Sequence, residues 1–362
     1  MNFTKKHSKT ALFNRIFSIA GLSIGGGILI GLIVHVKRTM DLRTLLAQVQ
    51  PGWLLLAALC IPLSESVDAL LFYGMGRSAG CPMKLAGCFD AAYIGEFYYK
   101  LGPAGAPIQL KLMYDAGMSA TYTASIYTWK AVANTMVYTV YAVAALAYEV
   151  FWRQESLGAA VAGAGVLIAL YLFLCGLAVF TAVRPAPIQR LIRRILTFLS
   201  RHWKVMAKEG MVDKGMNKVD EFCRQLRMFQ GNKRLLAGLY GGMFVELTIL
   251  FSIPYFLYRG LGLTGVSFWE LVMVQCLVMV LSRVIMLPGN AGGAEGSFYL
   301  FMGPIFGEHL AVGLVLWRFA SFLEVLLLGG VWSVGRFAKR SAARHHAQGT
   351  QEPDAQEKEG PA

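Results

Sequence analysis

Long apolar runs dominate the chain, and charged residues lie mainly between them. The runs are about 20 residues long and do not alternate between apolar and polar positions, so they predict helices rather than strands. In lipid every backbone amide must be hydrogen-bonded within the segment, which a helix of this length achieves. We therefore expect membrane helices at the runs, which cover approximately residues 16–36, 53–75, 85–101, 122–151, 157–183, 235–258, 268–287 and 310–334.

The composition agrees with this pattern. The 362 residues are 56% hydrophobic and 15% charged, whereas soluble domains carry about 25% charged residues. The chain is therefore expected to be all-α, a polytopic transmembrane helical bundle of about 6–8 spans. No small-residue cleavage site follows the first run, so we interpret it as an uncleaved span rather than a signal peptide.

Basic residues indicate which side of the membrane is cytoplasmic. Between Arg184 and Arg234 the chain has 13 Lys and Arg but only four acidic residues, an excess typical of cytoplasmic segments. Both chain ends have the same bias, so we expect a multi-pass protein of the cell (inner, cytoplasmic) membrane with both termini in the cytoplasm. The predicted divisions are a cytoplasmic N-terminus (1–15), a first membrane half (16–183), a basic amphipathic cytoplasmic segment (184–234), a second membrane half (235–338) and a disordered cytoplasmic tail (339–362).

Counting the runs on each side of segment 184–234 suggests that some do not cross. Five runs precede the segment and three follow it, yet cytoplasmic ends require an even number of crossings. Gly and Pro interrupt one run in each half, at Gly102–Gln109 and at Pro288–Gly296, and both residue types break helices. Each half therefore has a run that fails to cross, or one that is returned by a short extra helix. Flanking charges favour two interrupted, re-entrant segments that enter from opposite faces in an inverted repeat, the layout of alternating-access carriers.

Charged residues inside the runs are candidates for function, because a charge at the bilayer centre costs at least about 2.5–3.5 kcal/mol. Glu295 closes the second interruption, and Arg318 lies in the next run. Two compatible interpretations are a salt bridge that holds the hairpin and a site for a lipid headgroup, with Arg318 on the phosphate. Glu96 and Lys100 are spaced i,i+4 and are expected to meet on one helix face. The predicted substrate-binding residues are Glu295, Arg318, Gly289, Asn290, Gly292, Gly293, Pro103, Gln109, Lys130 and Arg283.

The sequence suggests no metal or cofactor. Its six cysteines and six histidines show no ligand spacing, and no ATP-binding loop is present, so a gradient or the lipid's own concentration difference must drive any transport. Residues 188–199 form a basic amphipathic pattern typical of helices on anionic membrane surfaces. Lipid attraction explains this charge, so no nucleic acid is expected as a partner.

Leu287–Tyr299, followed by Leu316–Phe319, resembles the Pro/Gly and Glu-Gly signature of the lysylphosphatidylglycerol synthase transmembrane-region family. This is the flippase-like membrane part of the multiple peptide resistance factor. Pro103–Gln109 is similar to the family's first Pro/Gly turn, and the resemblance covers about residues 15–340. It implies movement of phospholipid, classically aminoacylated phosphatidylglycerol, between leaflets, which weakens cationic antimicrobial peptides. Full-length relatives add a soluble domain that transfers lysine from lysyl-tRNA to phosphatidylglycerol, and no such domain is recognised here.

Three functional hypotheses follow. The first is a flippase-like protein that translocates aminoacylated phosphatidylglycerol or a related lipid, with anionic or aminoacylated phospholipids as partners. The second is phosphatidylglycerol lysyltransferase activity, or a membrane partner of a separate lipid-modifying enzyme; whether the chain alone is an enzyme stays open. The third is a non-transporting scaffold for envelope lipid synthesis. The oligomeric state stays open as well.

Overall fold

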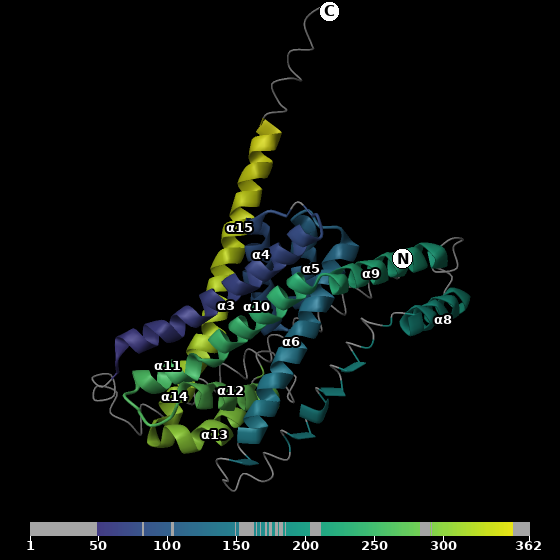
Figure 1. The fold of residues 1–362 in the computed structure, drawn as a ribbon. Helices are drawn as coiled ribbons and strands as arrows, with labels where there is room; N and C mark the ends of the chain where they lie inside the picture. The colour runs from purple at the N-terminus through teal and green to yellow at the C-terminus, as the bar shows by residue number, and fades with distance from the viewer. Residues whose placement is uncertain are drawn as a thin grey trace, which may run out of the picture.

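All regular structure in the described part of the chain is helical (Figure 1). The computed structural model describes residues 49–349, apart from 82, 103–104, 149, most of 152–185, 203–210, 283–289 and 291. The predicted run at 16–36 lies outside the described residues, as does most of the run at 157–183. The same is true of segment 1–15 and of residues 350–362.

Four helical stretches are long and apolar enough to cross a membrane, which confirms a multi-pass helical membrane bundle. The fourth stretch, Gly293–Arg336, does not run straight, because the chain folds back at Gly307, where φ is 52°. The first three stretches are α3 (Pro51–Ser78), α6 (Ala120–Tyr148), and α10 (Lys233–Phe251) with α11 (Ile253–Gly260). The fourth stretch contains α13 (Gly293–Phe306), η3 (Gly307–His309), α14 (Leu310–Arg318), the π-helical turn η4 (Phe319–Leu323) and the beginning of α15 (Glu324–Gly349).

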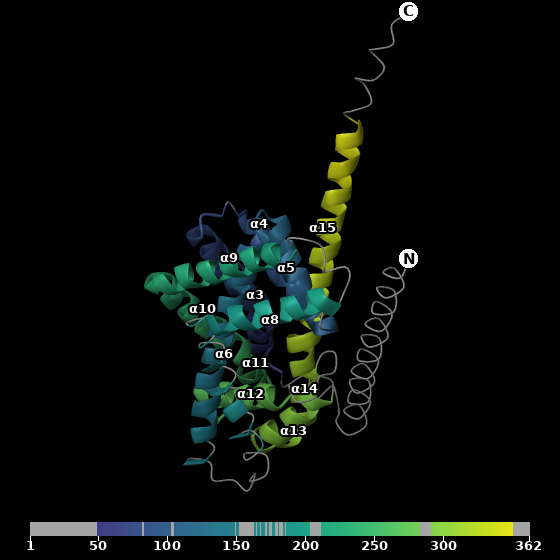
Figure 2. The same cartoon turned by 90° about the vertical axis from the view of Figure 1, so that its right-hand side faces the viewer.

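Two helical hairpins lie at opposite ends of the bundle. One pairs α4 (Leu85–Leu101) with α5 (Gly105–Asp115), and the other pairs α12 (Phe268–Ser282) with α13. Figures 1 and 2 both place the first hairpin at the upper end and the second at the lower end. Each of the four helices is shorter than the roughly 20 residues that a crossing requires.

Glycine allows the first hairpin to close tightly. A Cβ atom on Gly105 would lie 2.4 Å from Cα of Tyr99, so only glycine fits where α5 turns back on α4. In the second hairpin, Asn290 and Gly292 adopt positive φ angles of 52° and 82°. The Gly- and Pro-rich stretches predicted to interrupt helices therefore contain the starts of α5 and α13, the second helix of each hairpin.

The two halves pack against each other in a crossed arrangement. α3 contacts α10, α6 of the first half contacts α12 of the second, and α15 of the second half contacts α4 of the first. Small residues allow close approach at two of these contacts, as is common between membrane helices. A Cβ on Gly242 would lie 2.5 Å from the Leu71 side chain, and one on Gly329 would lie 2.5 Å from Phe97 Cβ.

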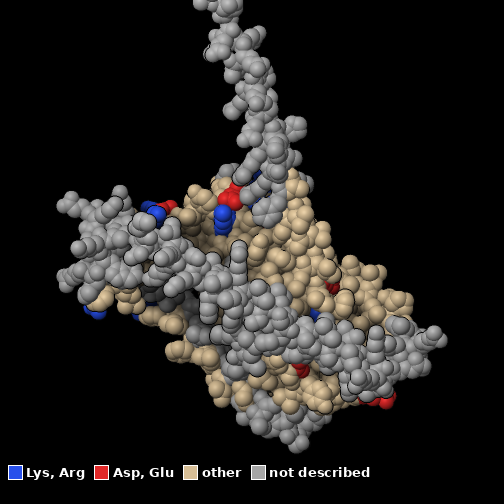
Figure 3. Space-filling view, turned by 180° about the vertical axis from the view of Figure 1, so that it is seen from behind, with Lys and Arg blue, Asp and Glu red and all other residues tan. Residues whose placement is uncertain are grey.

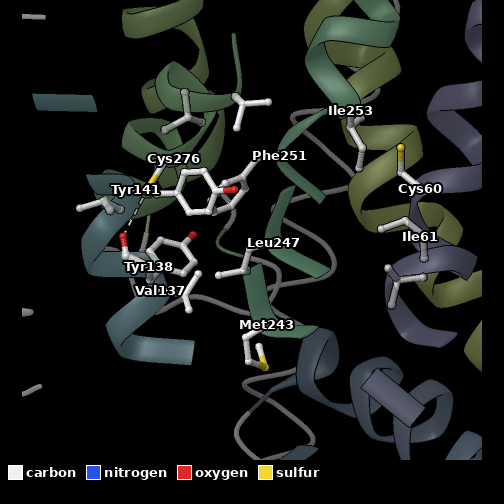
Figure 4. Close-up of a cluster of buried hydrophobic side chains, with 14 of the residues drawn as sticks. Cys60, Ile61, Val137, Tyr138, Tyr141, Met243, Leu247, Phe251, Ile253 and Cys276 are labelled. Atoms are coloured by element: carbon white, nitrogen blue, oxygen red, sulfur yellow. Dashed lines mark hydrogen bonds between the residues drawn. The ribbon is translucent and has the colours of Figure 1, made fainter. Parts of the chain in front are cut away.

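Aromatic side chains fill the contact between α6, α10 and α12 (Figure 4). Tyr138 and Tyr141 of α6 meet Phe251 of α10 edge-on, with ring centroids 5.3 and 5.4 Å apart, a geometry that aromatic quadrupoles favour. Cys276 of α12 donates a weak hydrogen bond to the Tyr138 carbonyl at 3.9 Å. One continuous core therefore links the halves.

Apolar side chains also cover much of the outside. Leu70, Val140 and Val331 are each more than half exposed, and among the described residues the face in Figure 3 has only small groups of charged side chains. A soluble protein rarely exposes so much apolar surface, whereas a membrane protein presents it to lipid.

The segment between the halves contains two helices, α8 (Ala186–His202) and α9 (Met211–Gly231). Trp129 of α6 donates a hydrogen bond to the Leu226 carbonyl of α9 at 3.2 Å, so α9 lies near the start of α6. On α8, Leu191, Ile195 and Phe198 are exposed beside Arg190 and Arg194. At the C-terminal end α15 extends to Gly349, past the predicted start of a disordered tail at residue 339.

Candidate functional site

Glu295 and Arg318 form a buried ion pair at the second hairpin. Glu295 lies in the first turn of α13, where its Oε2 accepts a hydrogen bond from the Gly292 backbone N–H at 2.6 Å. Its Oε1 accepts from Arg318 Nε at 2.7 Å and lies 2.6 Å from the Arg318 terminal nitrogen Nη2. One carboxylate therefore caps the start of α13 and also holds the arginine of α14.

The surroundings of Arg318 restrict it further. Arg318 is 6% exposed, its Nη2 donates to the Asn290 carbonyl at 3.5 Å, and its guanidinium lies 5.3 Å from the Trp317 ring and 5.8 Å from the Phe322 ring. The π-helical turn η4 follows immediately, and such turns are frequent at functional sites. The guanidinium is thus fixed by a carboxylate, a carbonyl and two rings.

Several predicted site residues come together here. Glu295, Arg318, Asn290, Gly292 and Gly293 all belong to this turn or pack against it. Two further predicted residues, Gly289 and Arg283, lie outside the described residues. The expected salt bridge is present, and the proposed contact with a lipid headgroup stays a prediction.

Lys130 belongs to a second ionic cluster in the first half. Its ammonium group pairs with Asp68 of α3, which is 4% exposed, and lies 4.4 Å from the centre of the Phe72 ring. Lys130 is about 15 Å along α6 from Ala120, and Asp68 is a similar distance from Ser78, at 1.5 Å per residue. Both therefore lie deep within helices that span roughly 30 Å of hydrocarbon.

Further carboxyl groups surround this pair. Glu246 of α10 and Glu65 of α3 lie close enough to Lys130 to interact with its charge, and Glu96 of α4 interacts with Asp68. Glu96 also pairs with Lys100 at 3.3 Å, as its i,i+4 spacing predicts. The carboxyl groups of Glu65, Asp68, Glu96 and Glu246 all lie within apolar runs of the sequence. The sequence does not show that they converge on Lys130, because they come from three helices.

Gln109 holds the first hairpin together. Gln109 donates to the Ala91 carbonyl at 3.2 Å, and its side chain packs against Gly95, so it joins α5 to α4. Pro103 lies outside the described residues. The role of Gln109 in substrate binding stays a prediction.

A narrow crevice with no room for a water molecule lies between α3, α4 and α15. Its acidic lining residues are Glu65 and Glu96, and its remaining lining residues are Ile61, Tyr93, Val325, Leu328 and Gly329. The described residues include no group of three His, Cys, Asp or Glu side chains that could hold a metal ion.

A third ion pair joins the halves at the α4–α15 contact. Asp90 of α4 pairs with Arg336 of α15 and accepts a hydrogen bond from Trp332 Nε1 at 2.9 Å. The Trp332 ring stacks on Tyr93 with centroids 4.6 Å apart. Asp90 lies within an apolar run of the sequence, but its partner follows 246 positions later and only the fold brings the two together.

Comparison with known families identifies the family of the chain. The family model described as "Lysylphosphatidylglycerol synthase TM region" matches residues 18–329, which is most of the chain. This chain belongs to that family. The match includes both hairpins and both ionic clusters, and it is to the membrane region alone, with no soluble synthase domain evident in these 362 residues. No curated protein sequence gives a significant match.

Proposed function

We propose that the protein is a lipid translocase that moves an anionic or aminoacylated phospholipid between the two leaflets. The observation that carries the proposal is the crossed packing of two halves whose short hairpins lie at opposite ends of the bundle. We infer that each hairpin is re-entrant and that the halves form an inverted repeat, as in alternating-access carriers.

The order and contacts of the helices support this inference. Each half begins with a long helical stretch, which is α3 in the first half and α10–α11 in the second. A hairpin follows, and then a second stretch, which is α6 in the first half and α14–α15 in the second. A two-fold axis in the membrane plane would exchange α3 with α10 and α4 with α12. The same axis would exchange α6 with α15. It would therefore convert the contact between α6 and α12 into the contact between α15 and α4, and both contacts are present.

The ion pair at the second hairpin supports a phosphate-bearing substrate. Arginine binds carboxylate and phosphate with the same planar set of donors, so a lipid phosphate can replace the Glu295 carboxylate on Arg318. The released carboxylate remains next to the start of α13, where backbone N–H groups stabilise negative charge. The pair would then exchange partners as the lipid passes, which lowers the cost of moving a charged headgroup through the bundle.

Headgroup-labelled phosphatidylglycerol in proteoliposomes tests the function. Flipping is measured as the fraction of label that a membrane-impermeant quencher reaches over time. Arg318→Gln and Glu295→Gln are expected to slow it about tenfold or more, since a hydrogen bond to a charged group contributes about 1.5–3 kcal/mol and 1.4 kcal/mol is a factor of ten. Glu308→Gln, at an exposed carboxyl in η3, is the matched control.

Two outcomes would contradict the proposal. Wild-type protein that flips no lipid, but co-purifies with an envelope enzyme, would favour the scaffold. Lysyl-phosphatidylglycerol that appears when this chain alone is expressed in a host lacking that lipid would favour the transferase.

Cysteine labelling tests the opposed hairpins independently of transport. Met118 and Phe306 mark the hairpin ends but are buried, at 2% and 1% exposed, so the neighbouring exposed positions Ser119 and Glu308 are better sites. Ser119→Cys and Glu308→Cys are expected to react with an impermeant maleimide from opposite sides of the membrane. Reaction from one side only would refute the inverted repeat.

A further inference from the structure

The cluster around Lys130 contains more acidic groups than cations. Asp68 forms an ion pair with Lys130, and Glu96 forms an ion pair with Lys100. Glu65 and Glu246 have no ion-pair partner among the described residues. Oε2 of Glu246 is enclosed by protein, and no donor in the described part of the chain reaches it.

Other groups facing the cluster do not change this balance. α6 adds the hydroxyl group of Tyr127 and α4 that of Tyr93, both of which interact with the carboxyl groups. From α15 the nearest carboxyl is Glu324, which faces Cys60 of α3 and adds no cation. Lys130 is therefore the cation that the described residues place beside Glu65, Asp68 and Glu246.

An ionised carboxyl without a partner at this depth costs at least about 2.5–3.5 kcal/mol. It avoids this cost by binding a cation or a proton. A metal ion needs several ligands around one point, and the described residues form no such group. A proton needs only one carboxyl group and one acceptor, and Glu246 lies near Asp68.

We propose that Glu65, Asp68, Glu246 and Lys130 form a proton-binding site whose occupancy is linked to the relative position of the two halves. The proton moves between water and a carboxylate oxygen of Glu65 or Glu246. Glu65 and Glu96 both line the narrow crevice between α3, α4 and α15.

The position of the cluster explains the linkage. α3 and α6 belong to the first half and α10 to the second, so Glu246 and Lys130 face each other across the contact between the halves. With its proton bound, Glu246 is neutral and leaves the ammonium group of Lys130 to Asp68. Once the proton leaves, Glu246 competes with Asp68 for the single ammonium group of Lys130, and the contact between α10 and α6 changes. That this movement carries lipid rests on the proposed function; the proton site itself does not.

Infrared spectroscopy of the purified protein tests the site without any transport assay. Protonated carboxyl groups have a carbonyl stretch that ionised groups lack. Wild-type protein at neutral pH is expected to show this band. Glu246→Gln or Glu65→Gln is expected to lower the area of the band by the amount that one protonated carboxyl group contributes. Glu308→Gln is the control, because Glu308 is exposed and lies outside the cluster.

Lys130→Gln provides a readout that a structural role would not produce. Without the ammonium group, Asp68 loses its partner, so the band is expected to grow by about one carboxyl group. A band that is unchanged in Glu65→Gln, Glu246→Gln and Lys130→Gln would overturn the proposal. A band that Na⁺ abolishes at constant pH would also overturn it in favour of a sodium site. Each variant is first shown to unfold cooperatively, and Asp68→Asn with Lys130→Gln replaces any single variant that does not.

Flipping assays at different pH values then separate the two proposals. If the infrared result holds and wild-type protein flips lipid, the flipping rate is expected to depend on pH, and Glu246→Gln is expected to remove most of that dependence. If wild-type protein flips no lipid, the proposed function fails while the infrared result still decides the proton site. A flipping rate with the same pH dependence in Glu246→Gln would refute the linkage.

Discussion

Replacing Gly329 tests the contact between α4 and α15, on which the crossed arrangement depends. In Gly329→Ala the new Cβ would lie 2.5 Å from Phe97 Cβ and 2.7 Å from the Tyr93 carbonyl oxygen. Neither atom belongs to the flexible end of a side chain, so α4 and α15 must separate. Overpacking of this kind typically costs about 1–3 kcal/mol.

A matched variant in the same helix isolates that cost. A Cβ on Gly335 would meet nothing within 4 Å, so Gly335→Ala changes only the helix propensity, which favours alanine by about 1 kcal/mol. Gly329→Ala gains the same propensity, so the difference between the two variants equals the overpacking cost. Gly330→Ala, whose Cβ would lie 3.7 Å from Phe97 Cε2, is expected to behave like Gly335→Ala.

Buried cysteines provide the assay. Cys60, Cys88 and Cys276 are each 3% exposed or less, so a thiol-reactive dye reports thermal unfolding of the protein in detergent. At about 2–4 °C per kcal/mol for a chain of 150–250 residues, Gly329→Ala should unfold several degrees below Gly335→Ala. Equal unfolding temperatures would refute the close packing of α4 on α15, and with it the two-fold exchange of contacts.

Three further predictions concern charges and a thiol. Glu295→Gln and Arg318→Gln should each lower the free energy of unfolding by about 3–5 kcal/mol, because each leaves the other residue's charge buried without its partner. The double variant should lose less stability than the sum of the two single losses. Additive losses in the dye assay would contradict a direct ion pair. Trp332→Phe keeps an aromatic ring beside Tyr93 but removes the hydrogen bond to Asp90, so unfolding should become easier by about 1.5–3 kcal/mol, and an unchanged unfolding temperature would show that this hydrogen bond contributes nothing. Burial raises the pKa of the Cys223 thiol in α9, so its alkylation rate should keep increasing above the ordinary thiol pKa; a plateau at that pKa, seen by mass spectrometry, would contradict its burial.

The sequence alone determined the membrane helices and the places where they break. An uninterrupted apolar run must form a helix in lipid, since its backbone has no other partners. Gly105 and Gly292 tolerate backbone conformations or contacts that other residues do not. The position of Glu295 at a helix start followed from the same local chemistry, because the helix begins where the glycines end.

Only the tertiary structure decided which buried charges meet. Lys130 lies 62 positions from Asp68 and 116 from Glu246, and three long apolar helices can pack in many rotations with almost equal burial of apolar surface. The contacts of α3 with α10 and of α15 with α4 depend on glycines that allow a close approach. Sequence periodicity shows no stripe that marks these contacts, because the apolar parts of these helices are apolar on all sides. In lipid, hydrophobicity places a helix in the membrane, but close packing and ion pairing choose its neighbours.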